Sequence, residues 1–241
     1  MTKTQSPLYT STGEMFQLAR VYYQVFNRTT VLGVFKKLHC IDFDSTGNRW
    51  VWLFEHEAKK LRLGKSYSQV SKEVRPVVIG SFTFRGEDQM LLDVRSWERA
   101  TQAIEFFDKR INRRAAQVTN LRIVNKLFES SREQVQEFSQ QSPDRFFDCD
   151  NVVRTGEALM ASFEQLKTVQ DIETRRQKAW ALIEQHAKTS PPEVEELATH
   201  FYEEGIEQLK VALKLRQLEL IERWNGNGDV NMLNIIQNYI Q

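Results

Sequence analysis

The sequence predicts an α+β protein, with antiparallel β-hairpins and a covering helix followed by a mostly α-helical C-terminal half that contains a long helical hairpin. Two observations predict this class. Apolar residues recur with a period of two in the first half and near 3.6 in the second, the periods of a strand and a helix. The charge changes at the same boundary, because residues 1–128 hold 21 Lys and Arg against 12 Asp and Glu, whereas 129–241 hold 12 against 20. We therefore expect a basic α+β domain, 1–128, and an acidic α-helical domain, 129–241.

Two hairpins are expected in the first half. The first joins the run 31–43 to the run 50–54 through the polar turn 44–48, where Gly or Asn supplies a positive φ. The second joins 77–84 to 90–94 through the turn 85–88. Residues 14–27 fit either a strand or a helix, because their β-branched and aromatic residues favour a strand while several apolar positions have helical spacing.

The covering helix is predicted over 96–112. Ser96 can cap it, and its buried face is formed by apolar residues three or four apart, namely Ala100, Ala103, Ile104, Phe107 and Ile111. Four cations follow at its end, Lys109, Arg110, Arg113 and Arg114, where positive charge complements the helix dipole. The same four residues are our candidate site for an anion or an acidic partner. The stretch 118–128 favours a last strand.

In the second half, the spacing predicts a helix over 151–188 and another from Ser190 to Trp224. Ser190 and Glu193 fit a capping box, with Pro191 at the first helical position. The short link between these helices would make them antiparallel. The later helix carries a second apolar stripe, formed by Val211, Leu215 and Leu218. Because one neighbouring helix covers only one side, this stripe is our candidate helix interface with another chain.

Motifs for catalysis or for binding a metal or cofactor are absent from the sequence. There is no G-x-S-x-G, no P-loop and no G-x-G-x-x-G, and the four histidines lack the spacing of zinc ligands. The two D-x-D pairs, Asp42/Asp44 and Asp148/Asp150, are better interpreted as turn and helix-cap residues than as cation ligands. We therefore expect no cofactor, no metal and no catalytic residues in a recognisable motif.

Composition favours a cytoplasmic protein without membrane insertion. The first 15 residues lack the features of an export signal, and no apolar run approaches the roughly 18 residues of a membrane span. Cys40 and Cys149 are the two cysteines, and a reducing compartment would keep them as thiols.

Aromatic residues interleave with basic ones in the first half, and this pattern allows two interpretations. Rings such as Trp50, Trp52 and Phe82 could stack on bases, but aromatic stripes more often belong to a core, and the covering helix needs a sheet face. The preferred function is a non-catalytic protein-interaction module, an accessory, assembly or regulatory factor that binds a protein partner or a second copy. The alternative is nucleic-acid binding by the basic half, and the third is an enzyme with a dispersed site.

Overall fold

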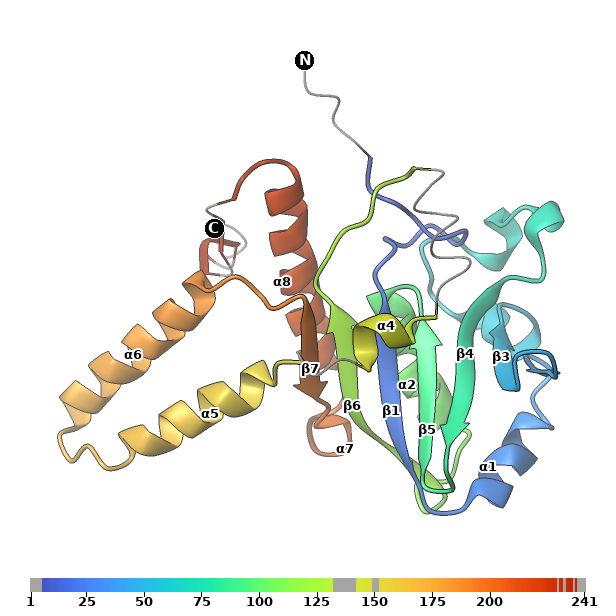
Figure 1. The fold of residues 1–241 in the computed structure, drawn as a ribbon, viewed down its shortest axis with the longest axis horizontal. Helices are drawn as coiled ribbons and strands as arrows, with labels where there is room; N and C mark the ends of the chain where they lie inside the picture. Colours follow the sequence, from blue (N-terminus) through green and yellow to red (C-terminus); the bar gives the residue numbers. More distant parts are fainter. Residues whose placement is uncertain are drawn as a thin grey trace.

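A seven-stranded antiparallel sheet organises the computed structural model, which describes residues 6–131, 142–148, 152–228, 230–231, 233–235 and 237 (Figure 1). Its order is β2-β3-β4-β5-β1-β6-β7. The strands are β1 (Ala19–Val25), β2 (Ile41–Asp44), β3 (Arg49–Leu53), β4 (Val78–Arg85), β5 (Gln89–Val94), β6 (Ala116–Val124) and β7 (Val194–Ala198). The helices are α1 (Arg28–Phe35), α2 (Trp97–Asp108), α4 (Asp144–Phe147), α5 (Thr155–Leu166), α6 (Ile172–Lys188), α7 (Phe201–Glu204) and α8 (Glu207–Trp224). The predicted α+β class is confirmed. Among the described residues, no helix is long and apolar enough to cross a bilayer.

Tight turns connect β2 to β3 and β4 to β5. In the first turn, a carboxylate oxygen of Asp44 accepts hydrogen bonds from the backbone N–H groups of Thr46 (3.1 Å) and Gly47 (3.2 Å), and Asn48 has a positive φ of 46°. In the second turn, Gly86 takes a φ of 65°, a conformation that side chains with a Cβ rarely adopt. Both turns set the register of the strands that they join.

The expected strand over 31–43 is wrong in its first part, which forms the end of α1. The side-chain oxygen of Asn27 accepts from the N–H of Thr30 (2.9 Å) and so caps this helix. Val31 and Phe35 then lie one turn apart and are both fully buried. The burial of this helical face outweighs the strand preference of the β-branched and aromatic residues in the run.

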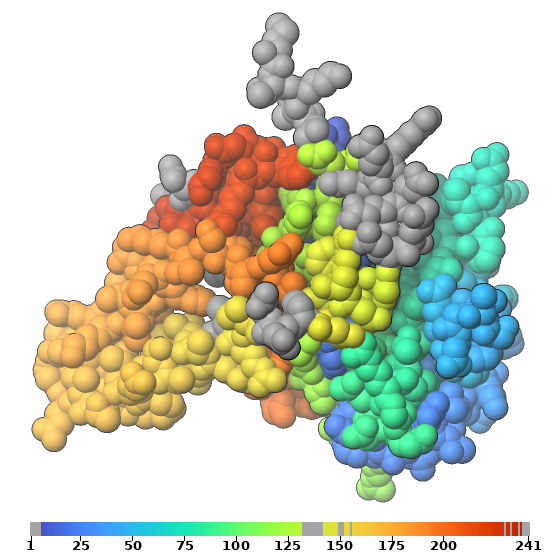
Figure 2. Space-filling view, in the orientation of Figure 1, coloured from blue at the N-terminus to red at the C-terminus, as the bar shows by residue number. Residues whose placement is uncertain are grey.

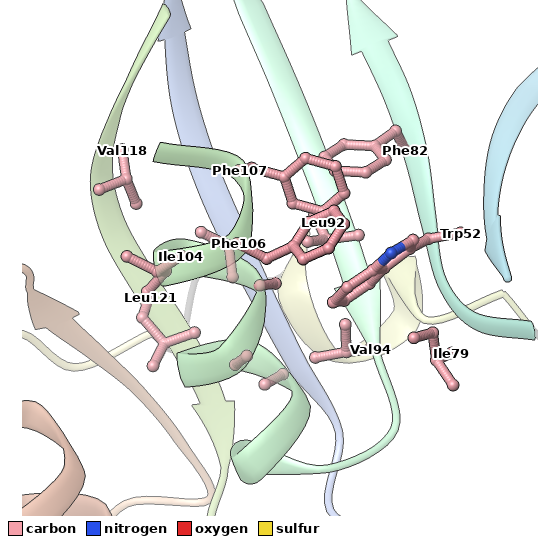
Figure 3. Packing of buried hydrophobic residues seen from close by; sticks show 14 of the residues in the cluster. Trp52, Ile79, Phe82, Leu92, Val94, Ile104, Phe106, Phe107, Val118 and Leu121 are labelled. Atoms are coloured by element: carbon pink, nitrogen blue, oxygen red, sulfur yellow. The ribbon is translucent and has the colours of Figure 1, made fainter. Parts of the chain in front are cut away.

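Helix α2 packs on one face of the sheet and closes the main core (Figure 3). Its N-cap is Ser96, whose hydroxyl accepts from the N–H of Arg99 (3.1 Å). The ring of Phe107 lies 5.0 Å from Trp52 and 4.8 Å from Phe82 between centroids, in edge-to-face geometry. Trp52 and Phe82 are fully buried here, so these rings belong to the core and offer no stacking platform for bases.

The opposite face of the sheet is charged, and the short helix α4 lies across it (Figure 1). Arg20 on β1 is buried there and forms ion pairs with Asp93 of β5 (2.6 Å), with Asp144 (2.6 Å) and with Asp148 (3.0 Å). Its guanidinium also lies over the ring of Phe147, 5.0 Å from the centroid. Arg20 therefore holds α4 against the sheet.

The predicted helix from Ser190 to Trp224 is wrong in its first half. Residues 194–198 form β7, which pairs antiparallel with β6 and extends the sheet by one strand. The buried carboxylate of Glu195 pairs with Arg216 (3.1 Å) and accepts from Asn125 (2.9 Å). Gly205, with a φ of 78°, then separates α7 from α8. An open edge on β6 and buried polar partners override the local helix preference of this segment. The expected cap at Ser190 and Glu193 therefore starts no helix.

The predicted single helix over 151–188 is also wrong, because it is two helices, α5 and α6. Asp171 interrupts the pattern by capping α6, since its carboxylate accepts from the N–H of Thr174 (2.9 Å). The helical hairpin of this protein therefore lies within 155–188, and not between that segment and the residues after 190. The proposed division at 128/129 stays a prediction, and β6 and β7 pair across it.

Candidate functional site

Helices α5 and α6 form a two-helix arm, residues 155–188, that stands away from the rest of the protein (Figure 2). Residues 167–171 connect the two helices. At the connection, hydrogen bonds from Thr174 lower the pKa of the Asp171 carboxyl, which keeps the N-cap ionised. At the other end, the arm joins the sheet through Val153, which forms an isolated parallel bridge with Glu195 of β7.

Very little of the arm is buried. Among the side chains described between 156 and 188, Ala187 alone is buried. Three large apolar side chains are instead exposed: Met160 (60%), Ile172 (75%) and Trp180 (62%). A helix of 12 or 17 residues obtains most of its stability in a protein from packing an apolar face. These two helices pack on each other, α5 also contacts β7, and the indole of Trp180 is left exposed to water.

An apolar groove of about 700 Å³ lies at the root of the arm. Its walls come from the start of α5, the outer part of β7, α7 and the first turns of α8, including Met160, Leu197, Phe201, Leu209 and Ala212. The exposed side chain of Met160 therefore belongs both to the arm and to the groove. Methionine adapts its shape to different apolar partners.

The two helices of the arm carry opposite charge. Helix α5 contains Glu157 and Glu164 and no basic residue, a balance of −2. Helix α6 contains four Lys and Arg against two Glu, a balance of +2. A surface that meets the whole arm would therefore need an acidic and a basic part.

The four predicted basic residues lie at the end of α2, as expected, but two of them have partners within the chain. Arg113 forms a bidentate pair with Asp108, with both N–O distances at 2.8 Å, and lies over the ring of Tyr202. Arg110 donates to the carbonyl of Phe106 (2.7 Å) and covers its ring. The side chains of Lys109 and Arg114 are exposed. The binding role of the cluster stays a prediction.

The predicted helix interface lies on α8. Val211 is 58% exposed, whereas Leu215 and Leu218 are half-buried. The other side of α8 packs into the main core through Leu213 and Leu220. The structure therefore places the three residues outside the core-facing side of the helix, and their role at an interface stays a prediction.

The described cysteine, Cys40, and two of the D-x-D aspartates, Asp44 and Asp148, have contacts within the chain. Cys40 is fully buried, and burial together with the neighbouring Glu57 raises the pKa of its thiol to about 12. In the part of the chain that the structure describes, no group of three His, Cys, Asp or Glu side chains is placed to hold a metal. Asp44 serves in a turn, as expected, and Asp148 pairs with Arg20. Cys149 and Asp150 lie outside the described residues.

Sequence reasoning missed Trp180. Its helical spacing is visible in the sequence, but spacing cannot distinguish an apolar residue that meets a neighbour from one that has none. Comparison with family models, with curated proteins and with solved structures finds no match for this chain. The assignment of function therefore depends on the geometry alone.

Proposed function

We propose that this protein is a non-catalytic interaction module, an accessory, assembly or regulatory factor, and that it docks a second protein chain through the arm. The exposed indole of Trp180, on a helix pair that buries almost nothing, carries this proposal. Burying the exposed part of an indole stabilises a complex by about 2–4 kcal/mol at about 25 cal/mol per Å². Tryptophan is also among the residues that most often dominate the energy of an interface.

The charge of the arm favours a second copy as the docked chain. If two arms pack antiparallel about a twofold axis, the acidic α5 of one copy can lie against the basic α6 of the other. Met160, Ile172 and Trp180 would then be covered by the same surface of the other copy. A different partner would need the same complementary pattern of charge.

Sedimentation of the full chain over a wide range of concentration tests the proposal first. We expect Trp180→Ala to weaken self-association about 30-fold or more, the effect of losing an interface residue worth about 2 kcal/mol. Val211→Ala removes an equally exposed apolar side chain from α8 and is the matched control. Undiminished association of the Trp180 variant, or a larger loss in the Val211 variant, would contradict docking through the arm.

Crosslinking identifies a different partner if the chain is a monomer. A photoreactive amino acid at the exposed position Gln177, less than one turn from Trp180, should capture a protein in native extract, and adding Trp180→Ala should abolish that capture. The same amino acid at the exposed position Lys214 of α8 is the control. Capture from position 214 alone would place the interface on α8, and capture from neither position in a monomeric protein would refute the proposed function.

Nucleic-acid binding by the basic half remains the alternative function. The burial of Trp52, Phe54 and Phe82 removes these three rings as stacking platforms for bases, so this alternative would depend mainly on phosphate contacts.

A further inference from the structure

A cleft of about 660 Å³ opens on the charged face of the sheet, away from the arm. Its floor is formed by β1, β3, β4 and β5, and residues 142–146 form one wall. This volume is within the range of about 300–1,000 Å³ that is usual for small-molecule sites. The proposed docking through the arm does not involve this cleft.

Arginine dominates the lining of the cleft. Six arginines contribute to it, namely Arg20, Arg49, Arg85, Arg95, Arg99 and Arg145. Four of them pair with carboxylates of the chain: Arg20 with Asp93, Asp144 and Asp148, Arg85 with Asp144 and Asp148, Arg49 with Asp44, and Arg99 with Glu14. Arg145 lies over the ring of Phe146.

Arg95 differs from these four paired arginines because no carboxylate pairs with it among the described residues. Its backbone is fixed by a hydrogen bond from the N–H of Gln17 to its carbonyl (3.0 Å), directly after β5. Its side chain is exposed to the solvent of the cleft. Both the surrounding protein and the like charge of Arg49 lower the pKa of Arg95. The positive charge of Arg95 is therefore uncompensated, and an anion in the cleft would stabilise it.

We propose that this cleft binds a small phosphorylated ligand, with Arg95 and Arg49 as its phosphate-binding residues. A guanidinium donates two parallel hydrogen bonds to phosphate oxygens. Arg95 supplies the uncompensated positive charge, and Arg49, whose charge is partly neutralised by Asp44, supplies further hydrogen-bond donors. Arg49 donates to Asp44 through Nε (2.9 Å), and among the described residues its terminal nitrogens donate to no protein group, so they remain available to a ligand.

The remaining lining suits the body of such a ligand. Val78, which is 47% exposed, contributes apolar surface to the cleft, the buried Phe16 and Leu18 contribute a small part, and Ser81 and Thr83 add hydroxyl groups from β4. A compact molecule with one charged end and one apolar or aromatic end, of the size of a nucleoside monophosphate, fits this combination.

Isothermal titration of the full-length protein at low salt tests the inference with three probes: adenosine monophosphate, inorganic phosphate and uncharged adenosine. We expect the monophosphate to bind most tightly, inorganic phosphate to bind more weakly, and adenosine to show no measurable binding. Arg95→Gln should weaken binding of the monophosphate at least about tenfold, since it removes charge-assisted hydrogen bonds. Because Arg95 has no carboxylate partner among the described residues, this variant should keep the melting temperature of the wild type.

Arg62→Gln is the matched control, because the side chain of Arg62 is exposed and does not line the cleft. The backbone N–H and carbonyl of Arg62 bond to the side chain of Gln102 on α2, which packs on the face of the sheet opposite the cleft. Three results would each overturn the inference: no binding of monophosphate or phosphate, equal effects of Arg95→Gln and Arg62→Gln, or equal binding of adenosine and its monophosphate. Binding of a single-stranded oligonucleotide without binding of the monophosphate would also overturn it, in favour of nucleic acid. Because Trp180→Ala should leave these titrations unchanged, failure of the cleft and failure of the arm are separate results.

Discussion

Replacing Arg20 by methionine should destabilise the protein strongly, because the variant keeps an unbranched apolar side chain but removes the guanidinium and its charge. The Arg20 side chain is 2% exposed, and its guanidinium donates twice to Asp93, at 2.6 and 3.0 Å. Among the described residues, the Asp93 carboxylate accepts only from Arg20, and it is 19% exposed. Arg20→Met therefore leaves a buried carboxylate without a partner, which costs about 3–5 kcal/mol.

The other two carboxylates contribute less to this cost. Asp144 and Asp148 are 48% and 35% exposed, and both keep Arg85 as a partner. The loss should therefore concentrate at Asp93. A second variant tests this, because adding Asp93→Leu to Arg20→Met removes the unpaired charge and should recover stability to within about 1–2 kcal/mol of the wild type.

Urea unfolding of the wild type, both single variants and the double variant measures these free energies. The double-mutant cycle gives the coupling between Arg20 and Asp93 directly, since the two side chains are in contact. If Arg20→Met costs less than about 1 kcal/mol, or if the double variant is as unstable as Arg20→Met alone, the pair does not have the energetic role that we derive from its burial.

Four further predictions concern other parts of the protein. Burial alone would raise the pKa of Glu57. Hydrogen bonds that its carboxylate accepts from its own backbone, from His39 and from Cys40 instead lower this pKa to about 2, below the usual 4.5. Ionised Glu57 thus contributes stability that is fully present above pH 4.5 and is lost as the pH falls towards 2. In denaturant titrations across this pH range, the free energy of unfolding of Glu57→Gln should fall less steeply than that of the wild type. The same pH profile in both proteins would contradict this. Cys40 should resist alkylation in the folded protein and react in urea, and mass spectrometry showing equal labelling in both conditions would contradict its burial. If the protein self-associates through the α8 stripe, Leu215→Glu should yield a folded monomer by sedimentation and circular dichroism, whereas an unfolded variant would assign Leu215 to the core. If the basic cluster binds nucleic acid, charge reversal at Arg113 and Arg114 should weaken filter binding and reduce its salt slope by about 0.7–0.9 per lost phosphate contact; no affinity at low salt would remove the nucleic-acid alternative.

Sequence reasoning came closest where the deciding contacts are local. The turn at Gly86 and the cap at Ser96 each depend on residues within three positions. Strands β4 and β5 begin and end within two residues of the expected bounds. Helix α2 starts where it was expected and ends four residues earlier. The fold class follows from the same local periodicity. Local geometry is encoded in a short window, which a single sequence displays completely.

The remaining elements depend on distant residues. Residues 194–198 contain good helix formers, but they form β7 because β6 offers an edge and Arg216 meets Glu195. The arm could not be recognised for the same reason. Trp180 is exposed because the fold places too few residues against it to bury it, and the sequence alone does not show which residues those would be. The cleft combines Arg49, at the start of β3, with Arg95, directly after β5, and no spacing in the sequence joins them.

The opposite charges of the two halves are partly explained by ion pairs between them. Arg20 pairs with Asp144 and Asp148, Arg85 with the same two carboxylates, and Arg122 with Glu196 (2.6 Å). Each of these pairs joins a cation of the first half to an anion of the second. Such pairs neutralise charge inside the molecule, so the excess of arginine in the first half is weaker evidence for an external anion than the sequence suggests.

The charges that no such pair neutralises are therefore the informative ones. Lys109 and Arg114 lie exposed at the end of α2, where bulk water and salt screen an isolated cation effectively. Arg95 lies in a cleft with Arg49 as its charged neighbour, where the surrounding protein reduces this screening. The same anion should therefore be stabilised more beside Arg95 than beside Lys109 and Arg114, which is the physical reason for seeking a ligand in the cleft first.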